Sequence, residues 1–354
     1  MSGPSIPPPR RILLVRPSSL GDVCRSVHIL ASLRAAFPAA WIDWLVQDSF
    51  VDAVRFHPAL SGVVPFPRAR LAGLGSISPS GLRWLRSLRR PRYDLVIDAQ
   101  GLLRSGIFTL ITGARVRVGF ANAREFGWLG ANRRAEAPEA LHAVERMALL
   151  LTPIGVPAQM DLRLYPPGGA DAAQGASRRA ALLAHLGIDS NHRFLLLAPT
   201  SKWAGKCWPP DRFAALAETL LARDNSLRVV VTASASERAQ CAPLLALADR
   251  CPHVIDAVGK TSVADLLTLI DAAALVVAND SAALHMAAGL GRPLVALFGP
   301  TDTTRVGPWQ RAGDVIQHIT PADTLDHKDA AAGAHLMQRI QVDEVVDACA
   351  QRLA

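Results

Sequence analysis

The sequence lacks the signatures of several common classes of protein. Its 354 residues contain no apolar run near the roughly 18 residues needed to span a bilayer. Five scattered cysteines, none in a CxxC pair, argue against a disulfide framework and against a zinc site, and they fit a reducing cytoplasm. Residues 1–10 are Pro-rich without an apolar stretch, so we expect a disordered tail and not a signal peptide.

Three nucleotide or metal motifs are also missing. No GxGxxG occurs, which disfavours a dinucleotide oxidoreductase. Gly259-Lys260-Thr261 resembles the end of a P-loop, but Val254 stands where that motif needs its first glycine. No Asp-X-Asp occurs that could hold a divalent cation on a diphosphate. We therefore expect no metal and no cofactor, with diphosphate charge met by Lys, Arg, hydroxyls and helix N-termini.

Lysine is scarce, and the positive charge is carried by arginine. The chain has 4 Lys against 34 Arg and a net charge of +8. Residues 1–165 carry 21 Arg and 11 acidic residues, whereas residues 166–354 carry 17 basic and 19 acidic residues. The first half should face an anionic nucleic acid, membrane or phosphorylated substrate, unless the excess is compositional drift. The densest stretch, Arg83–Arg92, is either a solvated helix face or a contact for acceptor or membrane.

Short apolar runs alternate with amphipathic helical stretches, which predicts βαβ units and parallel sheets. We expect two Rossmann-like domains, residues 11–165 and 190–335, joined by a linker over residues 166–189. The apolar stripe Val342, Val345, Val346, Cys349 and Leu353 predicts a C-terminal helix in residues 336–354 that crosses back to the first domain. The predicted strands are Ile12–Val15, Trp41–Val46, Val63–Phe66, Leu95–Ala99, Val116–Phe120, Phe194–Ala198, Val229–Thr232, Leu275–Ala278 and Leu294–Phe298.

The first segment suited to chemistry is Arg16–Val23 (RPSSLGDV), which leaves the first strand and opens a helix. Ligands of open α/β sheets lie outside the carboxyl ends of the strands. Gly21 permits a tight turn there, and Asp22 follows it. Asp22 is either a helix cap or a general base that accepts the proton of an acceptor hydroxyl.

The second segment, Pro199–Pro209 (PTSKWAGKCWP), follows the first strand of the second domain. Its hydroxyls and its lysines, Lys202 and Lys206, suit a diphosphate, although such loops are often only solvated. The third segment, Asn279–Ala288 (NDSAALHMAA), ends a buried strand and begins a small-residue helix. Capped by Asp280 or Ser281, that helix would offer free N–H groups to an anion.

Together these segments resemble glycosyltransferase family nine, the ADP-heptose:lipopolysaccharide heptosyltransferases. The likeness extends over nearly the whole chain and includes IDAQGLLRS at 97–105, AREF at 123–126, HAVER at 142–146, GKTS and FGPTD. IDAQGL and HAVER are most similar to the heptosyltransferase I branch, which acts on the Kdo-lipid A inner core. The resemblance implies the α/β GT-B fold, with two facing Rossmann-like domains that bind the acceptor and the sugar nucleotide, and an inverting, metal-independent transfer.

The resemblance also implies roles for individual residues. Asp22 would be the catalytic base, with Ser19 and Gly21 beside it. The family often has Gly at position 282, and the phosphate loop is one residue longer here, so Lys202 competes with Lys206 for the lysine role. The expected donor-binding residues are Thr200, Ser201, Lys206, Glu237, Lys260, Thr261, Asp280, Ser281, Ala282, Ala283 and His285, of which His285 taken alone is more typical of a packed helix residue. The expected acceptor-binding residues are Asp98, Gln100, Arg104, Arg124, His142 and Arg146.

The function implied is heptose transfer from ADP-heptose to an anionic glycolipid by a cytoplasmic enzyme at the inner face of the inner membrane. Three alternatives stay open. One is a related GT-B enzyme that uses another nucleotide sugar, such as a UDP-hexose. Another is a sugar-nucleotide 2-epimerase of similar architecture. The third is a non-enzymatic nucleotide- or nucleic-acid-binding protein, suggested only by the charge.

Overall fold

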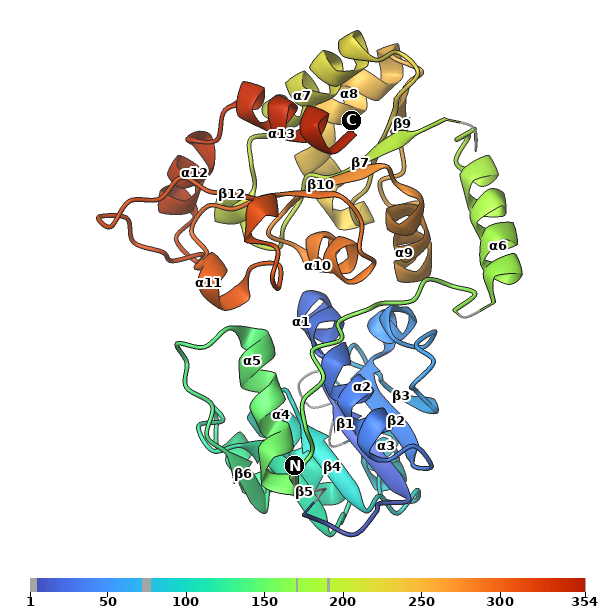
Figure 1. The fold of residues 1–354 in the computed structure, drawn as a ribbon, viewed down its shortest axis with the longest axis vertical. Coiled ribbons are helices and arrows are strands. Elements are labelled where there is room, and N and C mark those ends of the chain that lie inside the picture. Colours follow the sequence, from blue (N-terminus) through green and yellow to red (C-terminus); the bar gives the residue numbers. More distant parts are fainter. Residues whose placement is uncertain (1–4, 72–77, 170, 190–191, 354) are drawn as a thin grey trace. The chain divides into compact units, whose positions relative to one another are not determined.

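The computed structural model describes residues 5–71, 78–169, 171–189 and 192–353. The chain forms two compact units, Met1–Leu164 and Tyr165–Ala354. Each unit contains one six-stranded sheet in which every strand pair is parallel. The prediction of an α/β fold with two parallel sheets is therefore confirmed, and Figure 1 shows helices on both faces of each sheet.

The sheet of the first unit has the order β3-β2-β1-β4-β5-β6. In register, Val15 at the end of β1 lies beside Asp98 at the end of β4. Because the strand order reverses between β1 and β4, their carboxyl ends form the edge at which such sheets bind ligands. The elements are β1 (Arg11–Val15), α1 (Leu20–Arg25), α2 (Val27–Ala36), β2 (Trp41–Gln47), η1 (Asp48–Ala53), β3 (Gly62–Phe66), α3 (Pro79–Ser87), β4 (Leu95–Asp98), α4 (Leu103–Ile111), β5 (Val116–Phe120), η3 (Gly127–Gly130), β6 (Arg133–Ala135), α5 (Ala143–Ala148) and η4 (Leu149–Ile154).

The core of the first unit follows from strand alternation. Leu13 and Val15 point to one face of the sheet, where they pack with Phe108 of α4 and, at its rim, Trp84 of α3. Successive strand residues face opposite sides, so Ile12 and Leu14 bury themselves on the other face. Both faces are covered, which explains why the central strands are continuous apolar runs without polar alternation.

The sheet of the second unit has the order β12-β11-β10-β7-β8-β9. Ala198 at the end of β7 lies in register with Ala278 in β10, which again brings two strand ends together where the order reverses. The elements are α6 (Ala172–His185), β7 (Phe194–Ala198), η5 (Ala204–Lys206), α7 (Pro210–Arg223), β8 (Arg228–Val231), η6 (Ala235–Cys241), α8 (Ala242–Arg250), β9 (Val254–Asp256), α9 (Val263–Ala272), β10 (Leu275–Asn279), α10 (Ala282–Gly289), β11 (Leu294–Leu297), α11 (Thr303–Val306), η7 (Ala312–Asp314), β12 (Val315–Ile316), α12 (Ala330–Gln338) and α13 (Val342–Leu353).

Two expectations about the ends of the first domain are corrected. The described part of the predicted tail is packed, since Ile6 is 7% exposed and the Ser5 N–H donates to the Ile154 carbonyl at 2.9 Å. The predicted linker, residues 166–189, is largely helix α6, whose buried Leu182 and Leu183 anchor it. Its Gly- and Ala-rich composition is typical of a linker, but Asp171 caps the helix by accepting from the Gln174 N–H at 3.0 Å.

The expected crossing of the C-terminal helix is also corrected. Helix α13 packs on α7, β10 and β11 of its own unit. Val345, Val346 and Cys349 are fully buried there, in a core that includes Trp208 and Phe213. The apolar stripe was predicted correctly, but such a stripe indicates which face of a helix is buried and not which domain packs against it.

Candidate active site

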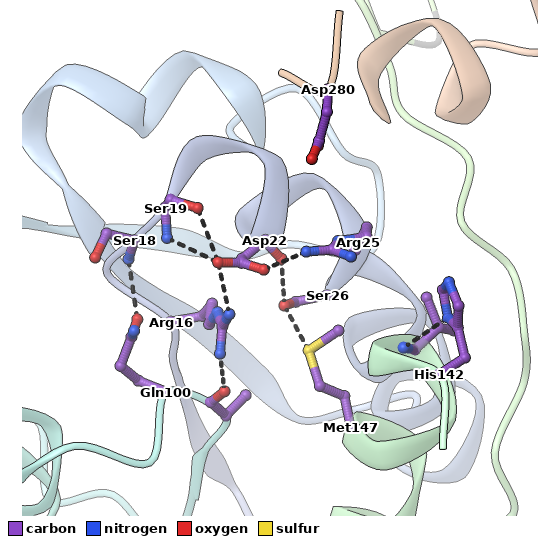
Figure 2. Close-up of polar contacts among 12 residues, drawn as sticks. Arg16, Ser18, Ser19, Asp22, Arg25, Ser26, Gln100, His142, Met147 and Asp280 are labelled. Carbon is purple, nitrogen blue, oxygen red and sulfur yellow. Dashed lines mark hydrogen bonds and ion pairs between the residues drawn. The ribbon is translucent and has the colours of Figure 1, made fainter. Parts of the chain in front are cut away.

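The carboxylate of Asp22 is the centre of a polar cluster at the carboxyl end of β1. Helix α1 begins at Leu20 with Ser19 as its N-cap, so Asp22 is the third helical residue and not the cap itself. One oxygen accepts from the Ser19 N–H at 3.3 Å and from the Ser19 hydroxyl at 2.8 Å. Figure 2 shows the carboxylate held between this serine and two guanidinium groups, those of Arg16 and Arg25. The Asp22 side chain therefore does two things at once: it completes the capping box of α1, and it presents a carboxylate suited to a general base.

The two arginines fix the charge of this carboxylate. Arg16 lies 3.0 Å and Arg25 2.5 Å from its oxygens, and the three side chains are 12%, 10% and 25% exposed in the order Arg16, Arg25, Asp22. Burial alone would raise the pKa of Asp22, but the two guanidinium groups and the Ser19 hydrogen bonds together hold it far below its ordinary value. Asp22 is consequently ionised at every pH at which an enzyme normally works.

The end of β4 completes this edge of the sheet. Arg16 also donates to the Ala99 carbonyl, and the Ser18 N–H donates to the Gln100 side chain at 3.1 Å. Asp98 is 3% exposed and accepts from the N–H groups of Gln100 at 2.9 Å and Gly101 at 3.1 Å. Burial raises the pKa of Asp98 to about 6, although these hydrogen bonds oppose the shift. Asp98 thus shapes the turn that carries Gln100 to the Asp22 loop.

The other expected acceptor residues lie in three places. His142 is the N-cap of α5 and accepts from the Val144 N–H at 3.2 Å. Arg146 on the same helix lies over the Phe120 ring, at 5.8 Å from its centroid. Helix α5 also contributes Met147, whose sulfur is 3.1 Å from the Ser26 hydroxyl, which bonds in turn to the Asp22 carbonyl. The structure therefore ties α5 to α1.

Arg104 and Arg124 are both exposed, and the described contacts do not join either of them to Asp22. Arg104 is at the start of α4, with its guanidinium 5.7 Å from the centre of the Phe66 ring. Arg124 donates its N–H to the Gly101 carbonyl at 3.1 Å, which places the loop before η3 beside the loop after β4. Their role in acceptor binding stays a prediction.

In the second unit, Asp280 is the centre of a matching cluster where β7 and β10 end. Lys206 and the Thr301 hydroxyl contact one carboxylate oxygen at 2.6 and 2.7 Å, and the Ser201 hydroxyl donates to the Asp280 carbonyl at 2.9 Å. Asn279 ties the two strand ends together, because its amide donates to the Pro199 carbonyl at 2.6 Å. The loops after β7 and β10 meet, as the sequence analysis expected.

The two candidate lysines differ sharply in this structure. Lys206 is 14% exposed and has its ammonium on Asp280, whereas Lys202 is exposed and lies over the Trp203 ring at 5.6 Å. An ammonium has three N–H donors, and the contact with Asp280 uses one. The geometry therefore favours Lys206 as the lysine of this cluster.

Helix α10 begins beside the Asp280 carboxylate, with Ser281 as its N-cap. Ser281 and Ala282 are partly exposed, while Ala283 and His285 are buried at 6% and 7% exposure. The small side chains leave the first N–H groups of the helix approachable, an arrangement suited to an anion. Thr200, 7% exposed, comes directly after β7.

The remaining expected donor residues lie at the ends of β8 and β9. Glu237 closes the capping box of η6, accepting from the Ser234 N–H at 3.0 Å and its hydroxyl at 2.6 Å. Lys260 is 52% exposed and 3.3 Å from Asp256. Thr261 follows it and is partly exposed. Gly259, with φ of +73°, brings this turn against Ala235 at the start of η6, so the Glu237 and Lys260 segments are neighbours.

Sequence reasoning assigned no role to four residues of the two clusters, although Arg16 and Thr301 fall within segments that it named. Arg16 and Arg25 pair with Asp22, and the only signal for them was position, directly before the loop and three residues after Asp22. Thr301 contacts Asp280 from the Gly-Pro-Thr-Asp turn after β11. Gln317 holds that turn, donating to the Gly299 and Thr301 carbonyls at 2.7 Å, and nothing in the sequence pointed to it.

Comparisons with known proteins identify the family of this chain. The family model described as glycosyltransferase family 9 (heptosyltransferase) matches residues 82–335. The lipopolysaccharide heptosyltransferase 1 of Pseudomonas aeruginosa is 31% identical over 308 residues, covering 85% of this chain and 82% of its own.

Two solved structures show the same fold. That of the E. coli ADP-heptose lipopolysaccharide heptosyltransferase II has a TM-score of 0.79 at 23% identity and covers 97% of this chain and 98% of its own. The E. coli heptosyltransferase WaaC, solved with ADP-2-deoxy-2-fluoro heptose, has a TM-score of 0.67 at 25% identity and covers 93% and 99%. The protein is thus an enzyme with the GT-B type of α/β fold, and it belongs to glycosyltransferase family 9, the heptosyltransferases.

Proposed function

We propose that this enzyme transfers a heptose from ADP-heptose to a lipopolysaccharide inner-core acceptor of the Kdo-lipid A type, with inversion at the anomeric carbon and without a metal ion. The observation that carries the proposal is the pair of clusters at the strand ends. The first unit holds an ionised carboxylate on Asp22, and the second holds Lys206 and the start of α10.

The donor assignment is supported by the anion chemistry of the second unit. Lys206, the hydroxyls of Thr200 and Ser201 and the first N–H groups of α10 would bind the diphosphate, because ammonium, hydroxyl and helix N-terminal N–H groups are all suited to an anion. A relative in the same family was solved with an ADP-heptose analogue. The Lys206 ammonium forms an ion pair with the Asp280 carboxylate in this structure, so a bound diphosphate would share the ammonium with that carboxylate.

In the proposed reaction, the acceptor hydroxyl attacks the anomeric carbon as the bond from that carbon to the ADP oxygen breaks. The hydroxyl proton passes to Asp22, and the negative charge leaves with ADP. Lys206 and the α10 amides would stabilise the departing phosphate, because fixed donors aimed at developing charge lower the barrier.

The low pKa of Asp22 is compatible with this role. A hydroxyl oxygen becomes strongly acidic once it bonds to the anomeric carbon, so the carboxylate needs to accept the proton only late in the reaction. Arg16 and Arg25 keep Asp22 ionised and hold it in one orientation. The two arginines therefore lower the basicity of Asp22 but keep its charge and its orientation constant.

Metal independence and acceptor class are further parts of the proposal. Diphosphate charge would be met by Lys206 and the α10 amides, so added EDTA should leave the rate unchanged. The excess of arginine in the first unit suits an acceptor that bears phosphates and carboxylates. We place the enzyme in the cytoplasm, on the inner face of the inner membrane, where such a lipid is accessible; within the described part of the chain, no helix combines the length and apolarity of a membrane span.

A donor panel tests the nucleotide and sugar directly. The midpoint of thermal unfolding is measured with ADP-, UDP-, GDP- and CMP-sugars at equal concentration, since a ligand that binds the folded protein raises apparent stability by an amount that grows with the logarithm of its affinity. ADP-heptose should give the largest rise, and Lys206→Ala should reduce it. A larger rise with a UDP-hexose would replace the donor assignment with the related enzyme that uses another nucleotide sugar.

A further inference from the structure

The first unit carries a concentration of exposed apolar side chains over α3, α4 and η3. Eleven large apolar residues are exposed among those that the structure describes, and six of them fall between residues 82 and 129. Contiguous apolar patches on a protein surface usually mark an interaction site. We call this region the α3–α4–η3 surface, and its apolar members, 40–67% exposed, are Leu82, Leu103, Ile107, Leu110, Phe126 and Leu129.

These side chains belong to neighbouring elements. On α4, Leu103, Ile107 and Leu110 are spaced by four and three residues, so they form one stripe along the helix. Beside that stripe Gly106 lies against η3, where an added Cβ would approach the Gly127 carbonyl oxygen to 2.4 Å. On the other side, α3 meets α4 through the Trp84 and Phe108 rings, whose centroids are 5.1 Å apart.

The backbone at Phe126 is a second, independent sign of function. Phe126 has φ of +61°, the left-handed conformation that L residues with bulky side chains rarely adopt, and its side chain is 67% exposed. Asparagine or glycine would fit this position with less strain. Folding of the unit therefore does not account for an aromatic side chain held in solvent here.

The charge of the same region is predominantly positive. Residues 82–134 contain eleven arginines and three acidic residues, a net charge of +8 that equals that of the whole chain. One of the acidic residues, Asp98, is buried in its turn. Arg83 and Arg86 are exposed on α3, Arg104 is exposed on α4, and Arg124 is exposed in the loop that leads into η3.

We propose that the α3–α4–η3 surface docks on an anionic phospholipid bilayer. Apolar side chains flanked by arginines are the pattern of interfacial membrane binding, in which the apolar groups enter the headgroup region and the cations meet lipid phosphates. A second copy of the chain is disfavoured as the occupant, because a two-fold interface would oppose the same arginines to one another. The inference rests on the proposed function only for its purpose, which is access to a membrane-borne acceptor.

Vesicle sedimentation of the full chain tests the proposal, without donor or acceptor present. The vesicles are phosphatidylcholine alone or with phosphatidylglycerol. The wild type should bind the anionic vesicles, and Arg83→Glu/Arg86→Glu should weaken binding by at least about 30-fold, since each arginine near an anionic surface contributes roughly five-fold. Arg179→Glu, an exposed charge reversal on α6, is the control and should change little.

The apolar part is tested by Phe126→Asn, with Ile319→Gln as the control for loss of an exposed apolar side chain elsewhere. Phe126→Asn should lower vesicle binding by roughly ten-fold while leaving the unfolding temperature unchanged or higher. Equal wild-type binding to both vesicle types, or variants that bind as the wild type does, would overturn the proposal. So would a dimer in light scattering that Phe126→Asn abolishes. If vesicle binding fails, the proposed transfer reaction still stands, because it is tested separately by measuring activity on an acceptor from which the acyl chains have been removed.

Discussion

Asp22→Asn is the substitution that separates the chemical from the structural role of Asp22, and the structure changes how it must be controlled. Asparagine keeps the size of the side chain but removes its charge. Arg16 and Arg25, each about a tenth exposed, would then lose their counter-ion, and the new amide would point donors at donors. Breaking a buried pair costs 3–5 kcal/mol; because Asp22 is a quarter exposed, we expect about 2 kcal/mol of lost stability.

The catalytic loss should be larger and should appear in the rate. General-base assistance contributes about 10²–10⁴-fold, so kcat with saturating donor and acceptor should fall by that factor while nucleotide binding persists. Arg25→Gln is the matched control, because it breaks one ion pair of the same cluster yet leaves the carboxylate in place. We expect it to lose comparable stability but to keep transfer within about ten-fold of the wild type.

Kinetics at a temperature where all three proteins are folded, checked by circular dichroism, provide the measurement. Equal loss of activity in Asp22→Asn and Arg25→Gln would refute the reasoning, because it would show that the intact cluster and not the base is required. A fully active Asp22→Asn enzyme would refute it too, and would leave Asp22 as the capping-box residue of α1 only.

Three further predictions concern other groups. Lys206→Ala should weaken binding of the sugar nucleotide about 10- to 150-fold in calorimetry, the loss of one charge-assisted contact, while Lys202→Ala changes it little; the reverse order would move the phosphate site. Asp98 has a pKa of about 6, above the ordinary 3.8, so its contribution to stability is complete well below pH 3.8 and falls by about 3 kcal/mol in total as pH rises through 6. Asp98→Asn, which keeps an oxygen for the turn, should remove that dependence, so the difference in unfolding free energy between the two proteins should change with pH across this window and stay constant above it. Arg104→Glu and Arg124→Glu should raise the KM of the acceptor more than that of the donor, and high salt should mimic them in the wild type; equal effects on both substrates would contradict the assignment of the acceptor to the first unit.

Much of the fold could be predicted because the central strands are long apolar runs bounded by turn residues. The edge strands β6, β9 and β12 were not predicted, since they have only three, three and two residues. An edge strand is recognised mainly by its neighbour in the sheet, which the local sequence does not contain. The same limit explains α13, whose stripe was predicted but whose packing partner was not.

The candidate site could be predicted where a residue lies in the first segment after a strand end. Asp22, Lys206 and Asp280 follow β1, β7 and β10 in this way, and the crossover rule for open α/β sheets brings the strand ends within each sheet together. Arg25 pairs with Asp22 three residues earlier on α1, a spacing that the local sequence does contain, although it was not used. Gln317 acts from the segment after β12, so its contacts depend on tertiary structure.

Transfer of the sugar itself tests the central claim most directly. The purified enzyme is incubated with ADP-heptose and a Kdo-lipid A acceptor in the presence of EDTA, and the products are analysed by mass spectrometry. The account predicts an acceptor heavier by one heptose, with one ADP released per transfer, and at least about a hundredfold less product from Asp22→Asn over the same period. Transfer from a UDP-hexose with none from ADP-heptose, or transfer that requires a divalent metal, would contradict it.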